Sequence, residues 1–138
     1  MVRIAVEDNP RLKASDIEFH LPTPSYTSHT LAHLHEKFPD RKFGLIIGED
    51  NLKSFRKWKN WESILQQEFL MIYPRRTAEP PNDLYQHPHV FICSDAPVIE
   101  LSSTEIRNGI KEGYDMRYCM PEKVFLYMRE MHFYEKKN

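Results

Sequence analysis

Apolar residues gather along the chain in short blocks that alternate with longer segments of helical spacing. Continuous or alternating apolar runs of four to eight residues are typical of strands. Strands are therefore predicted within residues 15–21, 42–50, 68–76, 89–93 and 96–101. The run in 42–50, KFGLIIGED, is closed by a glycine, and such a run is typical of a parallel strand that is buried on both faces.

The segments between these runs carry apolar residues at the spacing of one helical face. The first ten residues resemble the last turns of a helix that stops at Pro10. A helix capped near Ser25 or Thr27 and ended by Pro39 would bury a stripe formed by Leu31, Leu34 and Phe38. Further helices are predicted at 51–55, at 61–67, from Ser102, and from Pro121 with Val124, Phe125, Met128 and Met131 on one face. Residues 77–89 are interpreted as a proline-rich surface loop.

Strands that alternate with helices predict an α/β fold with a mostly parallel sheet. The length of 138 residues and the hydrophobic content of 41% suit a single globular domain, residues 1–138. A formal net charge of −1 gives no reason to expect nucleic acid or a membrane as a partner. Two cysteines without CxxC spacing, and no signal-peptide start, favour reduced thiols in a cytoplasmic protein.

The segment LSSTEIRNG, residues 101–109, is the first place where chemistry is indicated. Ser102 and Glu105 have the spacing of a capping box, which satisfies free backbone N–H groups at a helix start. The remaining amides, at Ser103 and Thr104, and the positive end of the helix dipole favour a bound anion such as phosphate. Arg107 lies one turn into the helix and could reach the same anion. Read alone, the segment fits either a plain helix cap or a phosphate site.

Two further positions follow the predicted strand at 42–50. Gly48 would let a ligand approach the backbone, and Asp50 could accept hydrogen bonds from ribose hydroxyls or merely cap the next helix. Trp58 could stack on a planar ligand ring or belong to the core, with Trp61 left to packing. In open α/β sheets, ligands collect at the carboxyl ends of strands, where Gly48, Asp50 and the turn before Ser103 are expected.

Histidine spacing gives no metal site. His29 and His33 lie one helical turn apart, as metal ligands do, but no third ligand is evident nearby. The GxSxG, Walker A, GxGxxG and HExxH patterns do not occur in the sequence. The common hydrolase, P-loop and zincin interpretations are therefore excluded.

Four segments, taken in order, resemble motifs of the bacterial nicotinate-nucleotide adenylyltransferases of the nucleotidyltransferase superfamily. They are PSYTSHTL, IIGEDNLKSFRKW, LSSTEIR and MPEKVFLYMREMHFY. The resemblance covers essentially the whole chain and implies a Rossmann-like nucleotidyltransferase fold. It also implies adenylyl transfer from ATP to nicotinate mononucleotide, which gives nicotinate adenine dinucleotide and pyrophosphate in NAD biosynthesis.

The resemblance also implies roles for particular residues. Arg107, as the catalytic residue, and the amides of Ser103 and Thr104 would hold the ATP phosphates. Gly48 and Asp50 would meet the adenosine part of ATP. Tyr26 and Thr27 would bind the nicotinate carboxylate through backbone N–H groups, and Trp58 would stack on the pyridine ring. Mg²⁺ would arrive with ATP, without a metal site of the protein's own.

The family's first strand and its glycine-rich H-x-G-H turn have no counterpart in these 138 residues. The resemblance therefore predicts an N-terminally incomplete domain without the family's first strand, helix and further strand. Two alternatives stay open. One is a non-catalytic α/β fragment that binds nucleotide or forms a homo-oligomer through an uncovered sheet edge, and the other is an enzyme acting on nicotinamide mononucleotide.

Overall fold

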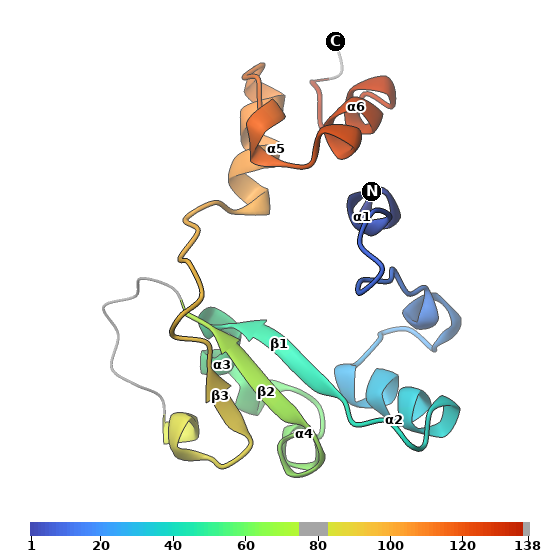
Figure 1. The fold of residues 1–138 in the computed structure, drawn as a ribbon, viewed down its shortest axis with the longest axis vertical. Helices are drawn as coiled ribbons and strands as arrows, with labels where there is room; N and C mark the ends of the chain where they lie inside the picture. Colours follow the sequence, from blue (N-terminus) through green and yellow to red (C-terminus); the bar gives the residue numbers. More distant parts are fainter. Residues whose placement is uncertain (75–82, 137–138) are drawn as a thin grey trace. The chain divides into compact units, whose positions relative to one another are not determined.

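The structure, a computed structural model, describes residues 1–74 and 83–136 (Figure 1). The chain packs into two compact units. One unit comprises residues 16–99, and the other joins residues 1–15 to the segment that begins at Glu100. The single domain expected from the sequence, residues 1–138, stays a prediction.

The unit of residues 16–99 is built on a parallel sheet, which confirms the predicted α/β class. Its described strands are β1 (Gly44–Gly48), β2 (Phe69–Tyr73) and β3 (Val90–Ile92), in the order β1-β2-β3. Both pairs of neighbouring strands are parallel, as Figure 1 shows. The register places Ile47 beside Ile72 and Ile72 beside Ile92.

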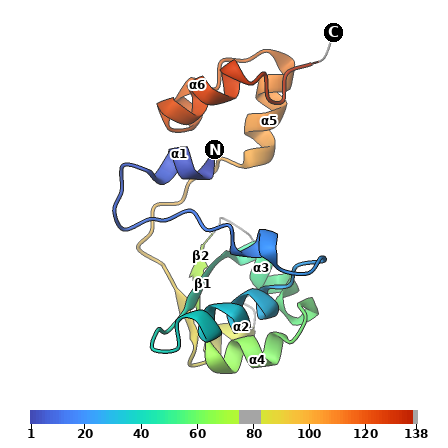
Figure 2. The same ribbon diagram turned by 90° about the vertical axis from the view of Figure 1, so that its right-hand side faces the viewer.

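Helices of the same unit pack against one face of this sheet. They are α2 (Thr27–Lys37), α3 (Glu49–Ser54) and α4 (Trp61–Gln67), with the 3-10 turns η2 (Phe55–Lys57) and η3 (Asp83–Gln86). Figure 2 shows α2 and α4 next to each other in front of the strands. The core between helices and sheet consists of Leu31, Ile47, Leu52, Phe55, Ile64, Leu65, Leu70, Ile72, Leu84 and Val90.

The prediction that β1 is buried on both faces is wrong. Ile47 is buried in the core, whereas its neighbour Ile46 points to the opposite face and is 73% exposed. Successive side chains of a strand point to opposite faces, and this unit supplies covering helices on one face only. A continuous apolar run therefore does not by itself establish burial on both faces.

Two predicted strands are absent from the described part of the chain. Ile17–His20 form the 3-10 turn η1, in which Phe19 N–H donates to Asp16 O at 2.9 Å. A strand needs a neighbouring strand to pair with, and none of the described strands pairs with this segment. Residues 96–101 are irregular because Pro97 has no N–H, and this segment is held by Tyr73 instead. The Tyr73 hydroxyl donates to the Pro97 carbonyl and accepts from Ile99 N–H.

Helix α2 confirms the predicted helix but not its caps. Tyr26 is the N-cap residue and makes no side-chain capping bond, so neither Ser25 nor Thr27 has that role. Of the predicted stripe, Leu31 is buried, whereas Leu34 and Phe38 are half-buried. In the predicted loop at 77–89, residues 77–82 lie outside the described residues, and η3 occupies part of the rest.

The second unit consists of helices α1 (Val2–Val6), α5 (Ser103–Glu112) and α6 (Glu122–Glu130), with the 3-10 turn η4 (Arg117–Cys119). Ile110, Phe125 and Met128 form its buried cluster. Lys123 of α6 pairs with Glu7 at 2.7 Å and Asp8 at 3.0 Å, so the first residues of the chain are joined to its last helix.

The ends of α5 and α6 follow from local chemistry. α5 ends at Glu112, and its C-cap residue Gly113 has a φ of 89°, in the left-handed region that favours glycine. α6 begins after Pro121, as predicted, and buries Val124, Phe125 and Met128. The prediction for Met131 is wrong, because α6 ends at Glu130 and leaves the Met131 side chain 47% exposed.

Candidate functional site

The start of α5 has the predicted capping box. Ser102 Oγ accepts from the Glu105 amide at 3.1 Å, and Glu105 Oε2 accepts from the Ser102 amide at 2.7 Å. This arrangement leaves the first-turn amides of Ser103 and Thr104 without an intrahelical partner, as helix geometry requires. Both residues are exposed. The cap and a phosphate site are therefore compatible, because they use different amides.

Arg107 leans back toward the beginning of α5. Its Nη2 donates to Thr104 Oγ1 at 3.2 Å, and the residue is exposed. The guanidinium therefore lies over the first turn of the helix, where the helix dipole is positive. An anion bound at the amides of Ser103 and Thr104 would meet a cation from the same helix.

The carboxyl end of β1 leads directly into α3. Gly48 is both the last residue of β1 and the N-cap of α3, with an ordinary φ of −71°. Asp50 therefore is not the N-cap, and it lies exposed in the first turn of α3. Its neighbour Glu49 accepts a hydrogen bond from the Tyr85 hydroxyl at 2.5 Å. Burial, followed by this bond and the charge of Glu49, raises the pKa of Tyr85 to about 12.

Trp58 and Trp61 both pack beside the buried ring of Phe55. The centroid of Trp58 lies 5.3 Å from that of Phe55, and the centroid of Trp61 lies 6.2 Å away with the rings edge to face. Both tryptophans are only partly buried. Trp61 also carries Arg56 over its ring at 5.6 Å, in agreement with the packing role expected for it. Trp58 is anchored on the core and keeps part of its surface exposed.

The Tyr26 and Trp58 segments meet through a residue that the sequence analysis did not single out. Lys59 places its Nζ 4.5 Å from the centroid of the Tyr26 ring, a cation–π geometry. The N-terminus of α2 and the segment that follows η2 are therefore neighbours. A lysine next to a tryptophan carries no sequence signal for this contact, because its partner is 33 residues away.

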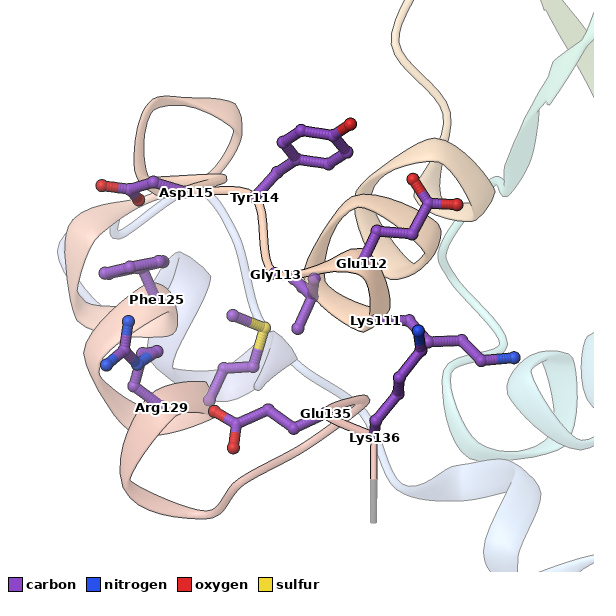
Figure 3. Close-up of a pocket in the computed structure, with 11 residues that line it drawn as sticks. Lys111, Glu112, Gly113, Tyr114, Asp115, Phe125, Arg129, Glu135 and Lys136 are labelled. Atoms are coloured by element: carbon purple, nitrogen blue, oxygen red, sulfur yellow. The ribbon is translucent and has the colours of Figure 1, made fainter. Parts of the chain in front are cut away.

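A pocket in the second unit lies at the other end of α5 from Ser103 (Figure 3). Its volume is about 420 Å³, and its lining includes apolar side chains, such as Phe125, beside Lys111, Glu112, Arg129 and Glu135. A helix of this length rises ~15 Å from its first residue to its last. The pocket, with acidic and basic residues mixed, is therefore not part of the candidate phosphate site.

The described residues contain no group of three or more His, Cys, Asp or Glu side chains arranged to hold a metal ion. Cys93 and Cys119 are free. In the part of the chain that the structure describes, no helix is both long and apolar enough to cross a membrane.

The predicted site residues are divided between the two units. Tyr26, Thr27, Gly48, Asp50 and Trp58 belong to the unit of residues 16–99. Ser103, Thr104 and Arg107 belong to the other unit, where they lie within one helical turn of each other. Their roles in binding stay predictions.

Residues 1–109 match the family model described as cytidylyltransferase-like. The chain is thus a member of the cytidylyltransferase-like nucleotidyltransferases. A protein of *Flavobacterium johnsoniae* named as a probable nicotinate-nucleotide adenylyltransferase is 50% identical over 137 residues, which are 99% of this chain and 70% of the relative. The chain belongs to the nicotinate-nucleotide adenylyltransferase family. A relative of the same name from *Bacteroides thetaiotaomicron* is 44% identical and matches 94% of this chain and 63% of the relative.

Two solved structures have the same fold. A protein from *Vibrio parahaemolyticus*, described as a putative nicotinate-nucleotide adenylyltransferase, superimposes with a TM-score of 0.71 at 23% identity, over 99% of this chain and 69% of that chain. The nicotinic acid mononucleotide adenylyltransferase of *Plasmodium falciparum*, solved with NaAD, gives a TM-score of 0.68 at 18% identity, over 87% of this chain and 62% of that one. Both likenesses confirm a nucleotidyltransferase fold.

Proposed function

We propose that this protein transfers an adenylyl group from ATP to nicotinate mononucleotide, and so forms nicotinate adenine dinucleotide and pyrophosphate for NAD biosynthesis. The observation that carries the proposal is the 50% identity, over 99% of the chain, to a relative named for this activity. The exposed first turn of α5, over which Arg107 donates a hydrogen bond to Thr104, supports the proposal independently.

In the proposed reaction, a 5′-phosphate oxygen of the mononucleotide attacks the α-phosphorus of ATP. A new P–O bond forms, the bond from the α-phosphorus to the bridging oxygen of the β-phosphate breaks, and pyrophosphate leaves. Such a transfer asks the protein mainly for alignment and for neutralisation of charge. Arg107 and the amides of Ser103 and Thr104 would supply that neutralisation at the ATP phosphates.

The other predicted residues would position the two substrates. Gly48 and Asp50 would meet the ribose of ATP, where the carboxylate can accept from hydroxyl groups. Trp58 would stack on the pyridine ring with its exposed part. The backbone N–H groups of Tyr26 and Thr27 would face the nicotinate carboxylate. The contact of Lys59 with the Tyr26 ring supports the assignment of Tyr26, Thr27 and Trp58 to one binding site, because Lys59 follows Trp58 in the chain.

Nucleotidyltransferases of this family generally use a divalent metal with the nucleotide. In this proposal, Mg²⁺ would arrive bound to the phosphates of ATP. There it would neutralise charge on the polyphosphate. The protein's own contribution would be Arg107 and the helix amides.

The test is an assay of pyrophosphate release by the product of the complete reading frame that contains these 138 residues, with ATP and Mg²⁺ supplied. We expect release that depends on nicotinate mononucleotide, with nicotinamide mononucleotide as the competing acceptor. No release of pyrophosphate with either acceptor would contradict the proposal. Faster release with nicotinamide mononucleotide would show that this amide, and not nicotinate mononucleotide, is the substrate. The substitution Arg107→Ala removes the positive charge proposed to neutralise the ATP phosphates, and we expect it to lower kcat roughly 100-fold.

The matched control is Lys111→Ala, which removes a cation from the other end of the same helix. Its kcat should stay within about twofold of the unsubstituted protein. Thermal unfolding of all three proteins separates an effect on turnover from an effect on folding. An equal loss of stability and activity in Arg107→Ala would count against the role given to Arg107.

A further inference from the structure

A second pocket, in the unit of residues 16–99, lies between helices α2 and α4. Its volume is about 320 Å³, and its lining residues are Ser28, His29, Leu31, Ala32, Asn60, Ser63, Ile64, Gln67 and Glu68. A water molecule takes up about 30 Å³ in the liquid, so this space suits a small molecule. None of the residues assigned to substrate binding lines this pocket, and the inference below does not depend on the proposed function.

The pocket contains a buried carboxylate with only one of its two oxygens engaged. Glu68, at the C-terminus of α4, is 1% exposed. Its Oε1 lies 2.5 Å from His35 Nε2 of α2, whereas its Oε2 is buried and has no hydrogen-bond partner among the described residues. Buried carboxylate oxygens normally accept a hydrogen bond, since leaving one unpaired costs free energy.

A second buried polar atom in the same lining also lacks a partner. The hydroxyl of Ser28, in the first turn of α2, has no hydrogen-bond partner among the residues that the structure describes. Ser28 and His35 are seven residues apart on α2, which corresponds to ~10 Å along the helix. The lining therefore holds two buried polar atoms without a partner among the described residues, Ser28 Oγ and Glu68 Oε2, together with the apolar side chains of Leu31, Ala32 and Ile64.

The charge of the pocket selects the class of ligand. An ionised carboxylate is an acceptor only, so the missing partner of Glu68 must donate. Among the described lining residues, neither lysine nor arginine occurs. A positively charged donor makes a stronger hydrogen bond to a carboxylate than a neutral donor does, so a cation is the favoured partner of Glu68 Oε2.

We propose that this pocket binds a small primary ammonium compound, whose N–H groups donate to Glu68 Oε2 and whose alkyl part lies along Ala32 and Ile64. A polar group at the far end of such a ligand would meet Ser28. The pocket is thus a ligand site separate from the residues assigned to ATP and the mononucleotide.

The test is an NMR titration of the ¹⁵N-labelled 138-residue chain with butylammonium chloride at about pH 8, where a primary alkylamine carries its positive charge. We expect saturable shifts of the Ala32, Ser63 and Gln67 amides. Butanol has the same alkyl chain but no charge, and it should bind at least tenfold more weakly. Occupation of the pocket by water only would give no saturable shift and would overturn the proposal, as would equal affinity for butanol.

Substitutions locate the binding site. Glu68→Gln keeps the shape of the side chain, and we expect it to weaken butylammonium binding at least tenfold. Glu62→Gln, on the exposed side of the same helix, makes the same change of charge and should leave the affinity unchanged. Ala32→Leu fills the pocket without touching Glu68 and should abolish binding while the protein stays folded. Unchanged binding in Ala32→Leu or in Glu68→Gln would overturn the proposal.

Discussion

At the scale of single residues, Trp58 offers the sharpest test of substrate positioning. It packs on Phe55 and keeps part of its ring exposed, so it can act in a binding site without being free to move. Trp58→Ala should raise the KM for nicotinate mononucleotide roughly tenfold, in line with the loss of one ring-stacking contact. The KM for ATP should change little. Steady-state kinetics with each substrate varied in turn measures both values.

The conservative variant Trp58→Phe controls for packing. It retains an aromatic ring, and its KM for the mononucleotide should lie between those of Trp58→Ala and the unsubstituted protein. A KM for the mononucleotide that is unchanged in Trp58→Ala would reject the stacking role.

The raised pKa of Tyr85 predicts how the stability of the folded state changes at alkaline pH. Burial and its hydrogen bond to Glu49 raise the pKa of Tyr85 from 10.0 to about 12. Because the folded state holds this proton more tightly, the contribution to stability is fully present below pH 10 and is lost as the pH rises toward 12. Ultraviolet titration of the phenolate, compared with Tyr85→Phe, isolates its midpoint. In Glu49→Gln the midpoint should fall toward 10, and an unmoved midpoint would show that Glu49 has no part in the shift.

The candidate residues differ in how far sequence could place them. Ser102, Glu105 and Arg107 act within one helical turn, so their spacing alone predicted the cap and the direction of the arginine. The contacts of Lys59 with Tyr26 and of His35 with Glu68 join residues 33 positions apart in the chain. Such pairs depend on how α2 packs beside α4, and no local pattern encodes them.

At the scale of elements, the capping box of α5 is expected to make a measurable contribution to the free energy of unfolding. Ser102→Ala removes the acceptor of the Glu105 amide and should lower the free energy of unfolding by about 1 kcal/mol. Ser103→Ala removes the adjacent, exposed hydroxyl, which lies outside the capping box. This substitution should change the free energy of unfolding by less than about 0.5 kcal/mol. Urea denaturation followed by circular dichroism compares them. Equal effects of the two substitutions would show that the cap contributes nothing specific.

The same scale explains why some strands were predicted and others were not. The apolar runs of β1, β2 and β3 each have a neighbouring described strand to pair with, and together they form the sheet. Residues 17–20 have the alternation of a strand, but none of the described strands pairs with them, and their backbone forms a 3-10 turn instead. The alternation of apolar and polar residues indicates which side chains of a segment can share a face. Strand pairing, however, depends on segments that are distant in sequence.

At the scale of the whole molecule, family membership and fold agree with the sequence motifs, although the chain spans 70% of the length of a relative such as that from *Flavobacterium johnsoniae*. The residues assigned to the proposed reaction are divided between the two compact units. The central proposal concerns the unit that contains α5: the first turn of this helix, with Arg107 over it, would bind nucleotide phosphate.

The most direct test is an NMR titration of the ¹⁵N-labelled protein with ATP and Mg²⁺, in which the amide signals of Ser103 and Thr104 are followed. The account predicts saturable shifts of both amides, and at least tenfold weaker binding in Arg107→Ala. Unmoved amide signals at ATP concentrations that saturate the protein elsewhere would contradict it.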